Sequence, residues 1–379
     1  MKFLNFGNKK NTSVIGVDIG ASSIKVVQLK KRRGVAVLET YGELSLGPYM
    51  NLEVGQATSP PAPKLAEALK DLLKEANVTT QKAGVSIPFS SSLISVVKMP
   101  VLKDKNLASM IPIEARKYIP VPISEVTLDW FIIPNEDKSL PLDDEDKEDK
   151  KKTETKKETS GKKIDVLVVA IHNSTLTKYN EIVKAVQLNV GFFEIEIFSA
   201  IRAIVGRSIT PTMVLDMGAG NTKLYIVEYG VVKTSHVINS GSQDITQTIS
   251  KSLGVSVSKA EQLKRKFGIE DGQSDDTIIN SKEAIVLGLN RVFSEANRVI
   301  LQYQQKYGKN VGNAVLTGGG ATVKGLLPIA KKHLEIDVSI SDPFSKIEAP
   351  AFFEKVLKEV GPGFAVAIGL ALRRLQEDT

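Results

Sequence analysis

The stretch "VIGVDIGASSIKVVQL", residues 14 to 29, predicts two strands joined by a turn of very small residues. The first strand ends in Asp18, and Lys25 follows on the second strand. A turn that only reverses the chain needs no more than Asn-Gly or Asp-Gly. The small residues of this turn are Gly20, Ala21, Ser22 and Ser23. Because no large side chain shields the backbone N–H groups there, we expect the turn to hold an anion.

The chain repeats this pattern in "VLDMGAGNTKLYIV", residues 214 to 227. The matching residues lie 198 positions apart: Asp18 with Asp216, Gly20 with Gly218, Ala21 with Ala219, and Lys25 with Lys223. Two strand-turn-strand copies so far apart predict two similar half-folds that face each other. A third glycine-rich turn, "AVLTGGGATVKG" from residue 314, follows a helix predicted over about 281–305. The buried face of that helix is predicted to be Ile285, Leu289, Val292, Phe293, Ala296 and Ile300.

Composition excludes several classes of function. The 379 residues contain no cysteine and three scattered histidines, which excludes disulfides and thiolate zinc sites and argues against a histidine-rich metal site. The start of the chain does not resemble a secretory signal, so we expect a cytoplasmic protein. The net charge is +7, and "KKRRG" at 30–34 is either a solvated hairpin turn or a contact for an acidic partner or lipid headgroup. We expect no nucleic-acid partner.

The remaining segments predict further α/β structure. Strands are expected at 14–19, 23–30, 34–44, 83–87, 93–99, 126–133 and 164–171, and helices at 63–78, at 104–118 and after the strand that ends at residue 171. From about Gln81 the pattern suggests a compact α+β unit of its own, in which Pro112 predicts a kink or a late helix start. The highly charged segment 137–163 is expected to be disordered, because its run from 143 onward has nothing to bury.

The turns suit a nucleotide triphosphate. Glycine lets the backbone approach phosphate oxygens closely, and two such turns can hold one triphosphate from both sides. Asp18 and Asp216 suit magnesium, directly or through water, and Lys25 suits the phosphate charge. Each aspartate could instead be a plain strand-end residue, and nothing in the pattern shows which face Lys223 takes. The remaining candidate contacts in the second and third turns are Gly218, Ala219, Gly220, Asn221, Thr222, Gly318, Gly319 and Gly320.

This order of motifs resembles the ATPase fold of actin, the heat-shock chaperones and the sugar kinases, and within it the FtsA and PilM family of actin-like proteins. The stretches that carry the resemblance are "GVDIGASSIKVVQL", "EARKYIPVPISEVTLDW", "LDMGAGNTKLYIVE", "SQDITQTISKSLGVSVSKAEQLKRKFG" and "AVAIGLALR". They are spread over residues 14–373. The "KYIP" motif is the most specific, because it belongs to the extra α+β unit. The resemblance therefore implies two half-domains around a nucleotide cleft, with an inserted FtsA-like subdomain.

The resemblance also implies domain limits. A first actin-like domain would span 12–207 and contain the inserted subdomain at about 80–171. A second would span 208–345, and the segment 346–379 would return a helix to the first domain.

The family likeness further suggests roles for three charged residues. Glu261 and Lys264 would lie on the helix that contacts ribose and base, although their pattern also fits exposed charges on an amphipathic helix. Glu196 is the candidate for positioning the attacking water, but Ile197 replaces the usual proline after it, and Glu196 could be only a strand-end acid. We therefore expect ATP and magnesium to bind with weak or no hydrolysis.

PilM-like proteins bind the short cytoplasmic tail of the membrane protein PilN in a groove beside the inserted subdomain. The resemblance thus implies a cytoplasmic scaffold of type IV pilus assembly, peripheral at the inner membrane through its partners. Two alternatives stay open. One is a small-molecule kinase, which needs a carboxylate base for its acceptor hydroxyl. The other is an FtsA-like filament protein, although we expect no lipid-binding helix after "GLALRRLQEDT"; self-association also stays open.

Overall fold

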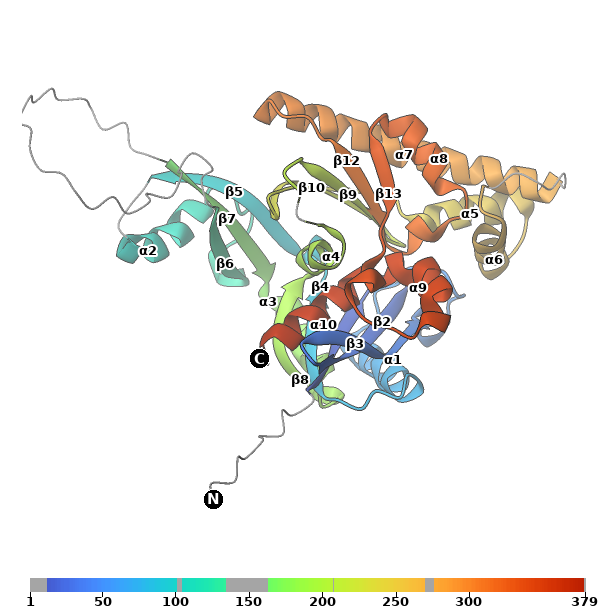
Figure 1. Ribbon diagram of the computed structural model, residues 1–379, viewed down its shortest axis with the longest axis horizontal. Helices are drawn as coiled ribbons and strands as arrows, with labels where there is room; N and C mark the ends of the chain where they lie inside the picture. The colour runs from blue at the N-terminus through green and yellow to red at the C-terminus, as the bar shows by residue number, and fades with distance from the viewer. Residues whose placement is uncertain (1–11, 101–103, 134–162, 207, 270–275, 378–379) are drawn as a thin grey trace, which may run out of the picture. The chain divides into compact units, whose positions relative to one another are not determined.

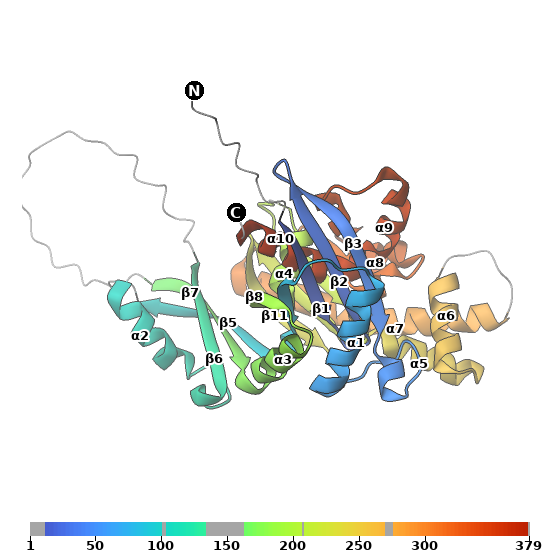
Figure 2. The ribbon, with the colours of Figure 1, turned by 90° about the horizontal axis from the view of Figure 1, so that it is seen from below.

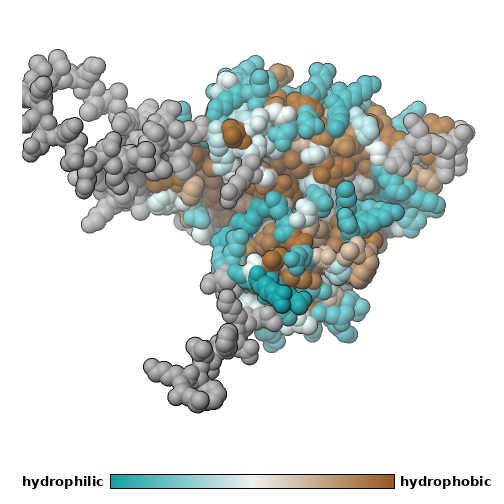
Figure 3. Space-filling model, in the orientation of Figure 1, coloured by the Kyte–Doolittle hydropathy of each residue, from teal (hydrophilic) through white to brown (hydrophobic). Residues whose placement is uncertain are grey.

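The computed structural model describes residues 12–100, 104–133, 163–206, 208–269 and 276–377 (Figure 1). The described chain forms two compact units, one from Ser91–Leu176 and one from the remaining residues. The segment expected to be disordered lies outside the described residues, except for Lys163, which begins a strand. No helix among the described residues is long and apolar enough to cross a membrane. Figure 3 shows hydrophobic residues (brown) lying between hydrophilic ones (teal) on one face.

The first sheet of the larger unit has the strand order β3-β2-β1-β4-β8. Its strands are β1 (Ser13–Ile19), β2 (Ser23–Arg32), β3 (Val35–Ser45), β4 (Lys82–Ile87) and β8 (Asn189–Ile195). The first three pair antiparallel, whereas β4 and β8 are added in parallel. The accompanying helices are α1 (Ala62–Glu75), α3 (Asn173–Ala185), α4 (Glu196–Ile204) and α10 (Ala365–Glu377).

Two helices cover opposite faces of this first sheet (Figure 2). Val27 belongs to the hydrophobic cluster that includes Ala367 of α10. Its neighbour Val26 pairs with Gly42, which lies against Leu72 of α1. Since successive residues of a strand point to opposite faces, α10 packs on one side of the sheet and α1 on the other.

The second sheet repeats the first, with the order β11-β10-β9-β12-β13. Its strands are β9 (Thr212–Met217), β10 (Thr222–Glu228), β11 (Val231–Ile238), β12 (Asn313–Thr317) and β13 (Asp337–Ile340). Its helices are α5 (Ser242–Leu253), α6 (Val257–Phe267), α7 (Asp276–Tyr307) and α8 (Leu326–Leu334). All six residues predicted for the inner face of α7 are buried in the core of this half.

The internal repeat is confirmed at the level of single residue pairs. Asp18 pairs with Lys25 across the first hairpin, and Asp216 pairs with Lys223 across the second. The turns also match, because the Gly20 amide donates to Ser23 O over 3.0 Å. The Gly218 amide likewise donates to Asn221 O over 3.0 Å. The two hairpins are therefore one local structure that occurs twice.

The described residues of the smaller unit include the three-stranded antiparallel sheet β5-β7-β6 and a helix that packs with it. Its elements are β5 (Ser92–Pro100), α2 (Asp104–Ala115), β6 (Val126–Ile133) and β7 (Lys163–His172). The prediction that this unit begins near residue 80 is wrong, because β4 pairs with β1 and β8 in the first sheet. Five of the six residues of β4 are buried, as expected for a central parallel strand.

Helix α2 runs through Pro112, so the predicted late start is not observed. It ends at Ala115, three residues before the predicted end. Ile111 and Ala115 pack into the core of the smaller unit together with Ile119 of the "KYIP" motif. The motif therefore has a structural role at Ile119, whereas its Tyr118 is exposed.

Helix α10 is held in the larger unit by two glycine contacts. A Cβ atom on Gly16 of β1 would lie 1.9 Å from Ala367 O. A Cβ atom on Gly369 would lie 1.9 Å from Ser199 O of α4. Backbone therefore packs directly on backbone on both sides of the helix, and neither contact leaves room for a methyl group.

We expect Gly369→Ala to destabilise the protein by about 3 kcal/mol, because α10 must move away from α4. Gly206→Ala is the matched control, since a Cβ atom there meets nothing within 4 Å, and should change stability by less than about 0.5 kcal/mol. Urea denaturation of both variants measures the difference. Equal midpoints would contradict the close packing of α10.

Candidate functional site

The first hairpin places a buried carboxylate beneath an exposed tip. Asp18 is buried at the end of β1, whereas Ala21 at the tip is exposed. Ser86 of β4 donates a hydrogen bond from its hydroxyl to Asp18 Oδ1 over 2.8 Å. Burial raises the pKa of Asp18, while the charge of Lys25 and the Ser86 bond act in the opposite direction. Ser86 was not predicted from the sequence, although a serine near the end of a mostly apolar strand was a usable signal.

The second hairpin has the same arrangement. Asp216 is buried at the end of β9, and Gly220 at the tip is exposed. The Gly218 and Ala219 carbonyls accept hydrogen bonds from the first amides of α5, which docks this helix onto the turn. The Thr222 hydroxyl donates to Ser240 O over 2.9 Å, so the structure uses it within the fold.

The three glycine-rich turns meet at one place. A Cβ atom on Gly220 would lie 3.8 Å from Ala21 Cβ, which brings the two hairpin tips together. Gly318 has a φ of +83°, and a Cβ atom there would lie 2.4 Å from Asp216 Oδ1. Only glycine fits at this position, because the third turn presses its backbone against the second aspartate.

The third turn also approaches Lys25. Gly363, in the short 3₁₀ helix η7 (Gly361–Phe364), lies next to both Lys25 and the third turn. A Cβ atom on it would lie 3.5 Å from Lys25 Cε and 3.9 Å from Gly319 Cα. Gly319 itself faces open space, and Gly320 is buried against Met217. The turns predicted from sequence to share one ligand are therefore neighbours.

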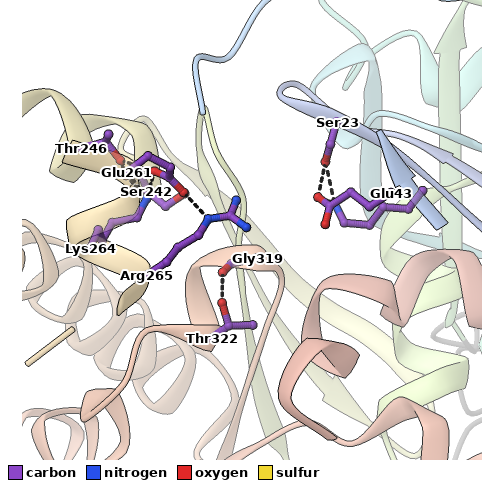
Figure 4. A network of polar contacts seen from close by, with 10 residues as sticks. Ser23, Glu43, Ser242, Thr246, Glu261, Lys264, Arg265, Gly319 and Thr322 are labelled. Atoms are coloured by element: carbon purple, nitrogen blue, oxygen red, sulfur yellow. Dashed lines mark hydrogen bonds and ion pairs between the residues drawn. The ribbon is translucent and has the colours of Figure 1, made fainter. Parts of the chain in front are cut away.

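Lys25 is held by one side chain of its own strand, β2, and one of the neighbouring strand β3. Its Nζ atom lies 3.2 Å from Glu43 Oε1 and donates to Ser23 Oγ over 2.8 Å. Although burial alone would raise the pKa of Glu43, the charge of Lys25 and the Ser23 bond lower it. Figure 4 shows this group on one side and the charged residues of α6 on the other.

Glu261 and Lys264 of α6 form a buried ion pair, which corrects the alternative that these two residues are exposed charges. Glu261 Oε2 lies 2.7 Å from Lys264 Nζ, and Thr246 of α5 bonds to both side chains. Arg265 Nε lies 2.7 Å from Glu261 Oε1 (Figure 4). Burial would raise the pKa of Glu261, but Lys264 and these hydrogen bonds outweigh it and lower the pKa to about 2.

Burial shifts the pKa values of Glu261 and Lys264 in opposite directions. Burial lowers the pKa of Lys264, and the charge of Glu261 only partly restores it. The short contact and the shared Thr246 hydroxyl nevertheless favour the charged pair at neutral pH.

Glu196 is the first residue of α4, directly after β8, and both of its carboxylate oxygens have donors. Oε1 accepts from the Phe89 amide over 2.7 Å, and Oε2 accepts from Lys223 Nζ over 2.7 Å. Lys223 Nζ also lies 3.4 Å from Asp216 Oδ2. The sequence left the orientation of Lys223 open. Its side chain points toward Asp216 and reaches Glu196 in α4 of the first half.

A segment for which the sequence predicted no role joins the two halves next to the first hairpin. Ala57 N donates to Gln243 Oε1 of α5, and Thr58 N donates to Ala21 O over 2.8 Å. Glu53 Oε2 accepts from the Ser258 amide of α6 over 2.6 Å. Residues 53–58 therefore bridge the first hairpin and the helices of the second half.

The described residues contain no group of three or more His, Asp or Glu side chains that could hold a metal ion. Asp18 and Asp216 are thus two carboxylates without a complete protein coordination sphere. Magnesium commonly takes only one or two protein carboxylates and completes its shell with water and phosphate oxygens. The residues fit magnesium held in that way, and they do not fit a protein-only metal site.

Two equivalent half-folds whose glycine-rich turns meet define the actin-like ATPase fold. Solved structures agree: a PilM-PilN type IV pilus biogenesis complex matches with a TM-score of 0.77 and 23% identity over 96% of this chain and 99% of that one. EutJ from Carboxydothermus hydrogenoformans gives 0.54, with 13% identity over 95% and 89% of the two chains. MreB5 of Spiroplasma citri bound to ADP gives 0.50, with 10% identity over 97% and 98%.

The family is shown by sequence. The family model of the type IV pilus assembly protein PilM matches residues 16–375, and the chain belongs to this family. Curated relatives include the cell division protein FtsA of Enterococcus faecalis, 29% identical over 35% of this chain and 34% of that protein. FtsA of Neisseria meningitidis is 30% identical over 41% of each. The chain thus spans about a third to two fifths of the FtsA relatives it matches.

The Glu261 network predicts a pH dependence of stability. The pKa of Glu261 in the folded protein is about 2, below its ordinary value of 4.5, so its contribution to stability is present above about pH 5 and is lost as the pH falls toward 2. The shift corresponds to as much as about 3 kcal/mol. We therefore expect Glu261→Gln to flatten the fall in unfolding free energy between about pH 5 and pH 3.

Glu67→Gln, which removes an exposed acid paired with Lys64 in α1, is the control and should keep the wild-type slope. Denaturant unfolding at each pH measures both. A wild-type slope in Glu261→Gln would contradict the network.

Proposed function

We propose that this chain is an ATP-binding cytoplasmic scaffold of type IV pilus assembly, peripheral at the inner membrane, that binds the cytoplasmic tail of a PilN-like membrane protein. The observation that carries the proposal is the family match over residues 16–375, together with the meeting of three glycine-rich turns. Neither a kinase acceptor site nor a filament contact is favoured by a specific observation in the described residues.

The nucleotide part of the proposal rests on how the turns are built. Each turn exposes its outermost residue, namely Ala21, Gly220 and Gly319. Backbone N–H groups at such tips can donate to phosphate oxygens without interference from a side chain. Lys25 adds a positive charge beside the third turn, which suits the phosphate charge. The α6 network, including Arg265, would then border the ribose and base.

Asp18 and Asp216 would hold magnesium, mainly through water, because each is buried beneath an exposed tip. When bound, the ion would neutralise phosphate charge that the protein leaves uncompensated. MreB5 of Spiroplasma citri, which shares this fold, was solved with ADP, which supports nucleotide as the ligand.

Hydrolysis is expected to be weak or absent. A carboxylate that positions the attacking water must have an oxygen directed at that water. Glu196 has one oxygen bound by the Phe89 amide and the other by Lys223. Burial raises the pKa of Glu196, and Lys223 opposes this shift. A scaffold needs the bound nucleotide more than its turnover, so this arrangement is consistent with the proposal.

ATP with magnesium should raise the thermal midpoint of the wild type, and the effect should be weaker with EDTA. Asp18→Ala and Asp216→Ala should each reduce the ATP-dependent shift, because each removes a carboxylate beneath the turns. Asp337→Ala, on the exposed start of β13, should keep the full shift. The shifts are measured by differential scanning fluorimetry. Equal shifts in all four proteins would contradict the site.

The partner part of the proposal rests on the smaller unit. β6 lies at an edge of its three-stranded sheet and carries Trp130 and Phe131, with Phe131 56% exposed. Tyr118 of the "KYIP" motif is also exposed. An extended peptide can add to such an edge through main-chain hydrogen bonds while apolar side chains give specificity. The structure of a PilM-PilN complex shows the same overall fold, which supports a PilN-like tail as the peptide.

A PilN-type N-terminal peptide should bind in calorimetric titrations, and Phe131→Ala should weaken binding about tenfold. Phe352→Ala, which removes a 78% exposed ring of the larger unit, is the matched control and should bind within about twofold of wild type. If Mg-ATP changes the peptide affinity, the peptide must change the ATP affinity by the same factor. No binding in either state, with ATP-dependent phosphorylation of a small metabolite, would favour a kinase.

A further inference from the structure

The meeting point of the two halves contains three buried carboxylates and one ammonium. Asp18, Asp216 and Glu196 are all buried, and they come from β1, β9 and α4. Lys223 Nζ lies 2.7 Å from Glu196 Oε2 and 3.4 Å from Asp216 Oδ2. Lys223 is therefore charged and shared between two carboxylates.

Tyr225 lies two residues after Lys223 on β10, so its side chain leaves the strand on the same side. The Tyr225 hydroxyl is buried and has no hydrogen-bond partner among the described residues. Two carboxylates at one positive charge supply oxygen ligands of the kind that hard divalent cations take.

The first hairpin offers an internal comparison. Lys25 occupies the register of Lys223, but its Nζ atom contacts Glu43 and Ser23. The repeat therefore does not require the lysine to enter the carboxylate cluster. Its position in the second hairpin is set by Glu196, which supplies the negative charge from the first half.

We propose that the Lys223 ammonium is a built-in cation that occupies the position between Glu196 and Asp216 where a divalent metal ion would otherwise bind. The wild-type protein consequently holds no divalent ion at this position by itself. Without Lys223 the carboxylates are buried and uncompensated, which is costly unless a cation replaces it. The inference concerns the cluster alone and does not depend on nucleotide binding.

The test measures Mn²⁺ binding to the full chain by electron paramagnetic resonance, without nucleotide. Lys223→Met should gain a site that binds Mn²⁺ at least about tenfold more tightly than the wild type, because two buried carboxylates lose their counter-ion. Lys223→Arg keeps the charge and should gain none. Lys25→Met, the same change in the first hairpin, should also gain none.

A second variant distinguishes a cation site from a general loss of structure. Lys223→Met/Glu196→Gln should lose the gained Mn²⁺ site, because one ligand becomes neutral. The thermal midpoint of Lys223→Met should be lowered in EDTA and raised again by Mn²⁺; if it unfolds in EDTA, refolding with Mn²⁺ is measured. Tight Mn²⁺ binding by the wild type, or no gain and no rescue in Lys223→Met, would overturn the proposal.

Discussion

The ion pair between Lys223 and Glu196 links the two halves of the larger unit at the point where their glycine-rich turns meet. The first half alone would leave Glu196 buried there with no opposite charge, and burying an unpaired charge is strongly unfavourable. Asp216 adds a second carboxylate at 3.4 Å, so the ammonium is needed by both halves. The relation between the two sheets is therefore constrained by electrostatics as well as by packing.

The two hairpins show how a repeated sequence can acquire different functions. Their backbones match in register and in the turn hydrogen bond, because the same small residues occur at the same spacing. Their lysines nevertheless differ, since Lys25 meets Glu43 of β3 and Lys223 meets Glu196 of α4. Local geometry follows from the repeated sequence, whereas side-chain partners follow from neighbours that are not repeated. The first lysine remains near the exposed turns, and the second neutralises the interior.

This distinction also explains which features of the fold and the site could be predicted from the sequence. The strands around Asp18 and Asp216 and the buried face of α7 follow from local patterns, and they were predicted. The membership of β4 in the first sheet was not predicted, because the sequence of an apolar strand does not show which strands it pairs with. The burial of Glu261 and Lys264 was also missed, since charges on an amphipathic pattern indicate an exposed face unless a tertiary partner such as Thr246 is known.

The segment 53–58 adds a second link between the halves, at the outer side of the turns. It bonds to Ala21 of the first hairpin and to Gln243 and Ser258 of the second half. The halves are thus connected both at the buried ion pair and at this outer segment. The two links involve different elements, α4 with β10 in the first case and residues 53–58 with α5 and α6 in the second. A rotation of one half against the other must therefore break the ion pair, the hydrogen bonds of residues 53–58, or both.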